Sequence, residues 1–266
     1  MSVVIADVES PDRSKTSLWR FCDIDCHFIG SAHNWAIDTL LINLHHFVRN
    51  MNRLHQWLCR SDRWRSTVAQ RFPWAIGNTD LGPNVLEIGP GPGLTTDLLR
   101  IAVPRLIALE IDSTLAGSLS SRLKGSNVQV IEGDATKMPF GDSEFSGAVS
   151  FTMLHHVPSR ELQNKVLVEV LRVLQPGGFF VGCDSLQNWF LRIIHIGDTL
   201  VPVSPDTFGA RLQGAGFEML EVQKNSQAFR FRARRSTASP VKTQIGCTKP
   251  AEMIRSVEEL RNKNKS

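Results

Sequence analysis

The stretch Val85–Thr95, VLEIGPGPGLT, joins a short apolar run to a helical pattern that begins at Leu94. An apolar run that ends at a glycine cluster predicts a buried strand followed by a tight turn. Glycine in such a turn lets the chain bend sharply and lets a ligand approach the backbone closely. A dinucleotide fingerprint would have glycine where Leu94 stands, so the loop fits a nucleoside better than a pyrophosphate.

Short apolar strands alternate with helical patterns beyond this loop. The expected strands are Asn84–Ile88, Arg105–Ile111, Val128–Ile131, Gly147–Phe151 and Phe179–Cys183, and the expected helices are Leu94–Ala102, Ser113–Leu123, Glu161–Leu174 and Pro205–Ala215. Strands separated by helices indicate βαβ units. Phe217–Gln223 and Ala228–Ala233, on either side of a polar turn, predict an antiparallel hairpin. The sequence therefore predicts an α/β fold with a doubly wound, mostly parallel seven-stranded sheet and a C-terminal antiparallel hairpin.

Two acidic residues mark the ends of the next two expected strands. Glu110 ends the second strand, where an acid can accept hydrogen bonds from both hydroxyls of a ribose. Asp134 follows the third strand and can accept a hydrogen bond from the exocyclic amine of adenine. Because the carboxyl ends of parallel strands share one edge of a sheet, we expect both acids to meet the glycine loop there.

These motifs, in this order, resemble those of class I S-adenosylmethionine-dependent methyltransferases. The resemblance rests on VLEIGPGPG, ALEID, GDATKMPF, FSGAVSFTMLHHV and VLRVLQPGGFF, and it spans Leu81 to Arg235. Within that superfamily, GDATKMPFGDSEFSGAV, LHHV and LRVLQPGG are most similar to small-molecule methyltransferases of the ubiquinone and menaquinone biosynthesis type. The resemblance implies a Rossmann-like fold, S-adenosyl-L-methionine as the cofactor and methyl transfer as the reaction.

The resemblance also implies which residues of the loop bind the cofactor. Glu87, Gly89, Gly91 and Gly93 would surround its methionine part. The sequence departs from the family pattern at Ser146, where an aspartate is usual. We interpret that position as structural, so the departure leaves the implied cofactor site in place.

Three further strand ends complete the implied site. Glu110 would hold the ribose hydroxyls, with Ile111 beside the adenine. Asp134 would meet the adenine amine, with Ala135 next to it. Phe151, at the end of the fourth strand, would close over the cofactor.

The sulfonium of the cofactor already activates the methyl group, so the protein mainly has to align the nucleophile for in-line displacement. A carbon or oxygen nucleophile also needs a base. His155 and His156 follow the fourth strand, and a histidine that titrates near neutrality suits that role, so His155 is the candidate catalytic residue. The other interpretation is that one or both histidines cap the following segment. Cys183 is predicted to be a small buried residue rather than a nucleophile.

The methyl acceptor is expected to be a small, largely apolar molecule of the quinol, phenol or lipid type. The connection Leu186–Val203 is rich in large apolar residues, which either pack onto the core or line a pocket. Those residues are Trp189, Phe190, Leu191, Ile193, Ile194, Ile196 and Leu200.

Two alternative functions stay open. The first is an rRNA adenine N-methyltransferase, because VLEIGPG and ALEID also resemble that group and basic flanks suit RNA. Those enzymes carry an Asn/Asp-Pro-Pro/Leu-Tyr/Phe type of motif, whereas Ser150–Met153 reads SFTM and the protein has no tyrosine. Nucleic acid is therefore not the expected partner. The second alternative is a non-catalytic cofactor-binding module, against which the intact Glu110 and Asp134 argue.

The charge distribution divides the chain into three parts. Residues 231–266 hold nine Lys/Arg against three acidic residues, residues 49–71 hold six Arg against one Asp, and residues 72–230 carry a net charge of −4. We predict a poorly ordered extension at residues 1–50, a methyltransferase domain at 51–235 that opens with a helical pattern from Met51, and a basic tail at 236–266. Basic flanks of this kind allow weak contact with an anionic membrane surface.

Composition excludes several classes of protein. A chain of 266 residues with 42% hydrophobic and 21% charged residues is an ordinary globular protein. Five cysteines, an odd number, argue against a disulfide framework and for a reducing, cytoplasmic compartment. We find no signal peptide and no membrane span. Cys22, Cys26 and His27 match no closed zinc site, so no metal is expected.

Overall fold

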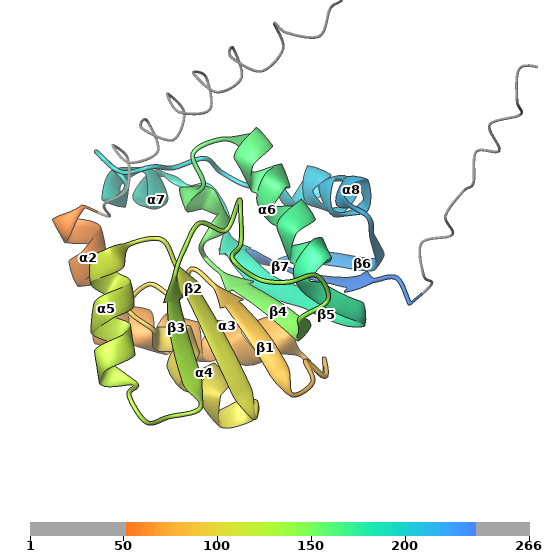
Figure 1. Ribbon diagram of the computed structural model, residues 1–266. Coiled ribbons are helices and arrows are strands. Elements are labelled where there is room, and N and C mark those ends of the chain that lie inside the picture. The colour runs from red at the N-terminus through yellow and green to blue at the C-terminus, as the bar shows by residue number, and fades with distance from the viewer. Residues whose placement is uncertain (1–51, 238–266) are drawn as a thin grey trace, which may run out of the picture. The chain divides into compact units, whose positions relative to one another are not determined.

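The computed structural model describes residues 52–237 (Figure 1). The predicted extension at residues 1–50 and nearly all of the predicted tail at 236–266 lie outside the described residues. The division of the chain into those parts therefore stays a prediction, and the architecture below concerns residues 52–237.

The described residues form a seven-stranded sheet with the strand order β3-β2-β1-β4-β5-β7-β6. The strands are β1 (Asn84–Ile88), β2 (Arg105–Glu110), β3 (Val128–Glu132), β4 (Phe145–Phe151), β5 (Leu174–Ser185), β6 (Phe217–Lys224) and β7 (Ala228–Arg235). Strands β1 to β5 pair in parallel, whereas β7 runs antiparallel to both β5 and β6. The predicted fold class, including its C-terminal hairpin, is confirmed.

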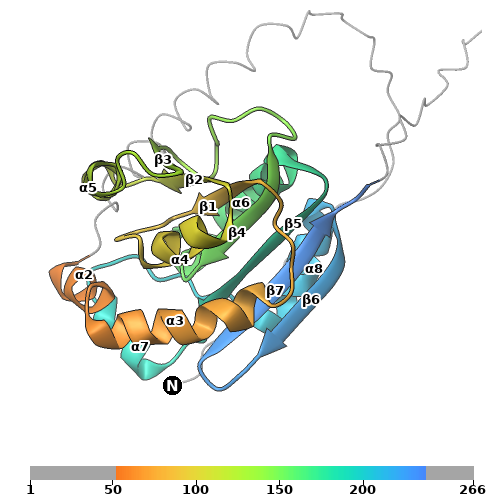
Figure 2. The same ribbon diagram turned by 90° about the horizontal axis from the view of Figure 1, so that it is seen from below.

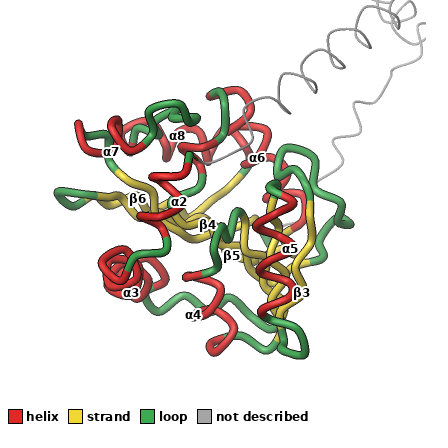
Figure 3. Tube along the Cα trace, turned by 90° about the vertical axis from the view of Figure 1, so that its left-hand side faces the viewer, coloured by secondary structure: helices red, strands yellow, loops and turns green. Residues whose placement is uncertain are grey.

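The helices cover both faces of this sheet. They are α2 (Arg53–Cys59), α3 (Asp62–Ile76), α4 (Leu94–Ala102), α5 (Ser113–Arg122), α6 (Arg160–Val173), α7 (Trp189–Ile194) and α8 (Pro205–Ala215), with a single 3₁₀ turn, η1 (Leu154–His156). Helices α3 and α4 lie on one face and α6 and α8 on the other (Figures 1 and 2), and α5 packs along β3 (Figure 3).

Handedness explains this distribution. The units β1–α4–β2 and β2–α5–β3 step toward one edge of the sheet, whereas β4–α6–β5 steps toward the other. Because crossovers between parallel strands are right-handed, the two directions place their helices on opposite faces. The reversal lies between β1 and β4, so their carboxyl ends flank the crevice where open α/β sheets bind ligands.

Apolar cores on both faces hold the sheet. Val85 and Leu86 are adjacent in β1 and both fully buried, yet they belong to different cores. Leu86 lies in the core that contains Phe180 and Phe208, and Val85 lies in the core that contains Leu99. Alternate side chains of a strand point to opposite faces, so a central parallel strand reads as one continuous apolar run.

Ser146 has a structural role. Its hydroxyl oxygen lies 2.8 Å from the Leu81 carbonyl oxygen and 2.9 Å from that of Asn84, and it accepts the Asn84 N–H at 2.9 Å. A Cβ on Gly82 would lie 2.6 Å from the Ser146 Cβ. Ser146 in β4 therefore fixes the segment that leads into β1.

The structure differs from the sequence-based expectation in three places. The helical pattern after Met51 is two helices, because Ser61 accepts the Trp64 N–H and caps a new helix, α3. Strand β5 spans Leu174–Ser185, so it begins five residues before the expected strand Phe179–Cys183 and includes the Pro-Gly-Gly segment. The unpredicted helix α7 begins after Asn188, whose side chain accepts the Leu191 N–H.

Gly182 of β5 provides a test of the packing between β4 and β5. A Cβ at this position would lie 1.9 Å from the Ser150 carbonyl oxygen, a backbone atom that cannot rotate away. We expect Gly182→Ala to lower the free energy of unfolding by about 2 kcal/mol or more.

The matched control is Gly117→Ala in α5, because a Cβ there meets nothing within 4 Å. In a helix this change stabilises by about 0.5–1 kcal/mol. Urea unfolding of both variants measures the difference, and equal effects would contradict the packing described for Gly182.

Candidate active site

The glycine loop between β1 and α4 leaves open space at one residue. Gly89, Gly91 and Gly93 all have positive φ, at 65°, 55° and 86°. A Cβ on Gly89 would lie 2.2 Å from the Met153 Cγ, and one on Gly93 would lie 2.4 Å from a Leu119 methyl carbon. A Cβ on Gly91 would meet nothing within 4 Å. Two of the glycines therefore serve packing, whereas Gly91 borders free space beside the backbone.

Glu110 holds this loop from the neighbouring strand. One carboxylate oxygen accepts the Gly91 N–H at 2.9 Å and the other accepts the Asp112 N–H at 3.0 Å. The side chain is buried, and burial raises the pKa of Glu110, although hydrogen bonds from Asp112 and Gly91 oppose the shift. A carboxylate has about four lone-pair directions, so Glu110 retains acceptor capacity beyond these two bonds.

Glu87 places an unpaired carboxyl oxygen where β1 meets the loop. The side chain is 1% exposed, and its Oε1 accepts a short hydrogen bond from the Thr95 hydroxyl. Its Oε2 is buried and has no hydrogen-bond partner among the described residues. Burial raises the pKa of Glu87 to about 7. A buried acceptor without a donor costs free energy until a donor arrives, so this position suits a cationic N–H group.

The residues expected around an adenine lie at the neighbouring strand ends. Asp134, just after β3, is partly buried and accepts the Thr136 N–H at 2.8 Å. Ala135 packs partly buried against the core, and Ile111, just after β2, is 37% exposed. The sheet order β3-β2-β1-β4 brings these positions to the edge that carries Glu87 and Glu110.

Phe151 faces the core at the end of β4. It is 7% exposed and stacks on Phe72 of α3, with ring centroids 5.5 Å apart. Its predicted role over a cofactor stays a prediction, because the contacts described here are with the protein itself.

His155 is held by an acid that sequence reasoning missed. Its Nδ1 lies 2.5 Å from Oδ1 of Asp184, near the end of β5, and its backbone N–H donates to Oδ2 of the same residue at 3.2 Å. Both side chains are buried. The sequence feature that could have identified Asp184 is its position at the carboxyl end of an apolar strand. The pairing fixes the direction of the imidazole.

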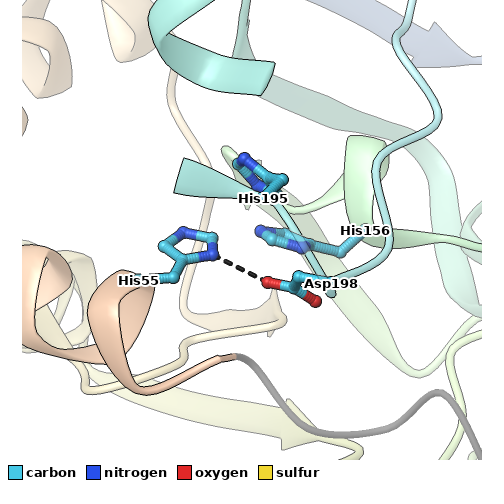
Figure 4. A group of neighbouring side chains, drawn as sticks. All are labelled: His55, His156, His195 and Asp198. Atoms are coloured by element: carbon cyan, nitrogen blue, oxygen red, sulfur yellow. Dashed lines mark hydrogen bonds and ion pairs between the residues drawn. The ribbon is translucent and has the colours of Figure 1, made fainter. Parts of the chain in front are cut away.

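Three residues that the sequence analysis did not identify as candidates lie beside His155. His55 of α2, His195 after α7 and Asp198 converge with His156 (Figure 4), and their donor atoms lie within 4.8 Å of one another. Burial lowers the pKa of His195 to about 4 and that of His156 well below its ordinary value. No local motif links residues so far apart in sequence.

Cys183 conforms to its predicted structural role. It is 2% exposed, and burial raises the pKa of its thiol to about 12. A thiol that stays protonated at neutral pH is a poor nucleophile, so Cys183 acts as a small core residue.

Glu87 makes stability depend on pH in a defined direction. Its pKa rises from an ordinary 4.5 to about 7 on folding, so between these values the unfolded chain loses a proton that the folded chain keeps. Unfolding therefore becomes easier as pH rises from about 5 to about 7, by an amount on the order of 3 kcal/mol.

In the Glu87→Gln variant this side chain is neutral in both the folded and the unfolded state, so it contributes no pH dependence to the free energy of unfolding. We expect the free energy of unfolding of Glu87→Gln, relative to the unsubstituted protein, to increase between about pH 5 and pH 7.5. Urea unfolding of the ligand-free proteins measures it, and parallel pH profiles would contradict the assignment.

Comparison with known proteins agrees with the site. Residues 86–182 match the model of a methyltransferase domain family. The chain is 29% identical over 161 residues to a sterol 24-C-methyltransferase of Gibberella zeae, covering 52% of this chain and 40% of that protein. It is 31% identical over 105 residues to a demethylmenaquinone methyltransferase of Clavibacter sepedonicus, covering 39% and 41%. It is 46% identical over 66 residues to a probable ribosomal RNA small subunit methyltransferase A of Thermococcus onnurineus, covering 25% and 24%.

Solved structures share the fold. A crystal structure of an S-adenosylmethionine-dependent methyltransferase from Methanosarcina mazei superposes with a TM-score of 0.51 at 18% identity, covering 60% of this chain and 95% of that one. The chain spans less than half the length of each of the three named relatives. Fold, glycine loop and matched sequence together show that the domain described here belongs to the class I S-adenosylmethionine-dependent methyltransferases.

Proposed function

We propose that this protein transfers the methyl group of S-adenosyl-L-methionine to a small, largely apolar acceptor. The single observation that carries the proposal is the convergence of the glycine loop with Glu87, Glu110 and Asp134 at adjacent strand ends. One such element alone occurs in many α/β proteins. Three acids on three neighbouring strands, beside open space at Gly91, match the several polar groups of this cofactor.

The assignment of groups follows from their chemistry. The cofactor's ammonium group would donate to Glu87, whose Oε2 has no other partner, and Gly91 would border its methionine part. Glu110 would use its remaining lone pairs for the ribose hydroxyls, with Ile111 alongside the base. These residues bind and orient; the bound cofactor supplies a methyl group activated by a sulfonium.

The remaining cofactor contacts come from β3 and β4. Asp134 would accept the adenine amine, with Ala135 against the ring. Phe151 would close over the cofactor, and Gly89 and Gly93, which keep the loop packed, would adjoin its methionine part. Excluding water here strengthens each polar contact.

His155 would act as the general base. Asp184 accepts the proton of Nδ1, so a neutral imidazole presents an unprotonated Nε2 that can take a proton from an acceptor hydroxyl or carbon acid. Asp184 then stabilises the imidazolium that forms, as a buried carboxylate does for a catalytic histidine.

Exposed apolar side chains on α7 and just after it support an apolar acceptor. Trp189 and Phe190 are 73% and 51% exposed, and Ile193 and Ile196 are 47% and 73% exposed. Leu191 is buried and Ile194 and Leu200 are partly buried, whereas the four exposed side chains lie outside the core. Relatives whose names specify a sterol and demethylmenaquinone act on apolar molecules, which agrees with this surface.

An anionic membrane surface would be a suitable source of such an acceptor. No helix among residues 52–237 is long and apolar enough to cross a membrane. Exposed apolar groups on α7 and the basic residues of the flanks would give weak, reversible contact, at about 1 kcal/mol per close Lys or Arg. The two described cysteines, Cys59 and Cys183, are buried free thiols, in keeping with our proposal of a cytoplasmic location.

An RNA adenine acceptor is the second candidate. The similarity to the probable ribosomal RNA small subunit methyltransferases A of Thermococcus onnurineus and Methanosarcina barkeri covers 25% and 30% of the chain. The segment after β4 is SFTM rather than an Asn/Asp-Pro-Pro type of motif, and it leads into His155. A non-catalytic cofactor-binding module is the third candidate. A methyl-transfer assay with radiolabelled cofactor against quinol, phenol, lipid and RNA fractions distinguishes the three candidates.

Glu110→Ala tests the cofactor site. The variant loses a charged acceptor of two ligand hydroxyls, so we expect calorimetry to show cofactor affinity lower by about 1–3 kcal/mol. The matched control is Glu218→Ala on the edge strand β6, an exposed acid, whose affinity should equal that of the unsubstituted protein. No cofactor binding by the unsubstituted protein at millimolar concentration would refute the proposed function.

Replacing Trp189 and Phe190 together by Ala tests the acceptor surface. Both side chains are exposed, so the melting temperature and cofactor affinity should hold while methyl transfer to the apolar acceptor falls. Leu191→Ala is the matched control: it removes a buried group of the same helix and should lower the melting temperature. Unchanged transfer by the double variant would remove α7 from the acceptor site.

A further inference from the structure

The side chains of His55, His156, His195 and Asp198 point toward one another from segments far apart in sequence (Figure 4). His55 lies on α2, His156 ends η1, and His195 and Asp198 follow α7. The donor atoms all lie within 4.8 Å of one another. We infer that these four residues bind a divalent transition-metal ion, of which Zn²⁺ is the best match to the ligands.

The free nitrogen of His195 gives independent support for a ligand. Its Nδ1 lies 2.7 Å from the Leu191 carbonyl oxygen. A carbonyl only accepts, so Nδ1 carries the proton and a neutral ring has its lone pair on Nε2. That Nε2 is buried and has no hydrogen-bond partner among the described residues, in a side chain 4% exposed. A buried lone pair that receives no hydrogen bond, within 4.8 Å of the ligand atoms of three other residues, is explained by a cation between them.

The donor set fits zinc in kind and number. Imidazole nitrogen and carboxylate oxygen are both zinc ligands, at about 2.0–2.2 Å, and four of them complete a tetrahedron. Donor atoms of such a tetrahedron are about 3.4 Å apart. The pairs here are at most 4.8 Å apart, and the His55 Nδ1 and Asp198 Oδ2 pair, at 2.8 Å, is a hydrogen bond. Small side-chain rotations, with a turn of the His55 ring or release of the hydrogen-bonded proton to solvent, would let all four residues bind the ion.

The surroundings hold the ligands in place. The Leu191 carbonyl fixes His195, and Asp198 Oδ1 accepts the Thr199 N–H at 2.8 Å. Asn52 donates to the carbonyl oxygens of Ile194 and Ile196 at 2.7 and 3.2 Å, which ties the start of α2 to the end of α7. Such second contacts orient metal ligands in proteins.

The proposed ion is structural. Four protein ligands leave a tetrahedral ion no open position, which is typical of structural zinc sites. It joins α2 and α7 to the segment after β4, where His155 lies. The site lies beside His155, but none of its four ligands is a group assigned to the cofactor or to the base.

Metal binding is tested on the full-length, untagged protein, stripped with a chelator and then titrated with Zn²⁺ and with Co²⁺. We expect about one ion per chain, a visible Co²⁺ absorption of tetrahedral intensity that Zn²⁺ abolishes, and a higher melting temperature with Zn²⁺. The Co²⁺ spectrum requires no variant, so it stands even if a variant fails to fold.

The variants His156→Gln and His195→Gln should each weaken Zn²⁺ binding by about 100-fold or more and abolish the Co²⁺ spectrum. His155→Gln is the matched control: it changes a buried histidine of the same cluster that pairs with Asp184, and it should still bind the ion.

Two results would overturn the inference. One is a chain that binds less than a few tenths of an ion per molecule after loading, which would make the cluster a metal-free group of hydrogen-bonded histidines. The other is full Zn²⁺ binding by both ligand variants, which would place the ion elsewhere in the chain.

Discussion

The reversal of strand order between β1 and β4 is the constraint on which the site depends. Parallel strands on either side of that point step in opposite directions, and right-handed crossovers send their helices to opposite faces. The crossover helices α4 and α6 therefore diverge to opposite faces at the carboxyl ends of β1 and β4. The polar residues that follow these strands can therefore face a ligand instead of a core.

The acids at this edge illustrate how a fold tolerates unfavourable groups. Glu87 and Glu110 are buried at 1% and 5% exposure, and burial raises the pKa of both. Backbone N–H groups donate to both carboxylate oxygens of Glu110, whereas Glu87 retains an unpaired oxygen. Glu87 is thus one of the buried polar groups that lack a hydrogen-bond partner, and proteins often have such groups at functional sites.

Local patterns predicted most of the fold. Strand β1 and helices α4 and α8 begin and end where the sequence indicates. Their bounds are set by apolar periodicity, glycine and proline, which determine the backbone conformation locally. Helix α7 escaped prediction, since six residues with an apolar majority fit a loop equally well. The start of β5 at Leu174 was not predicted either. It depends on the pairing of Leu174 with Phe145, a tertiary contact that the Pro-Gly-Gly sequence does not indicate.

The glycine loop, Glu110 and Asp134 were predictable because a motif fixes their spacing. The role of Asp184 toward His155, and the gathering of His55 and His195, depend on contacts between distant segments. No local pattern in the sequence indicates such contacts.

The contact of Met153 with Gly89 links the two halves of the site mechanically. The Met153 side chain occupies the volume that a Cβ on Gly89 would need, so the loop beside the cofactor position and the segment that carries His155 share one packed boundary. Neither can shift without displacing the other, since a close-packed interior transmits strain. Occupancy on one side of that boundary is thereby thermodynamically linked to occupancy on the other. By reciprocity, whatever factor the first ligand applies to the affinity of the second, the second applies to the first.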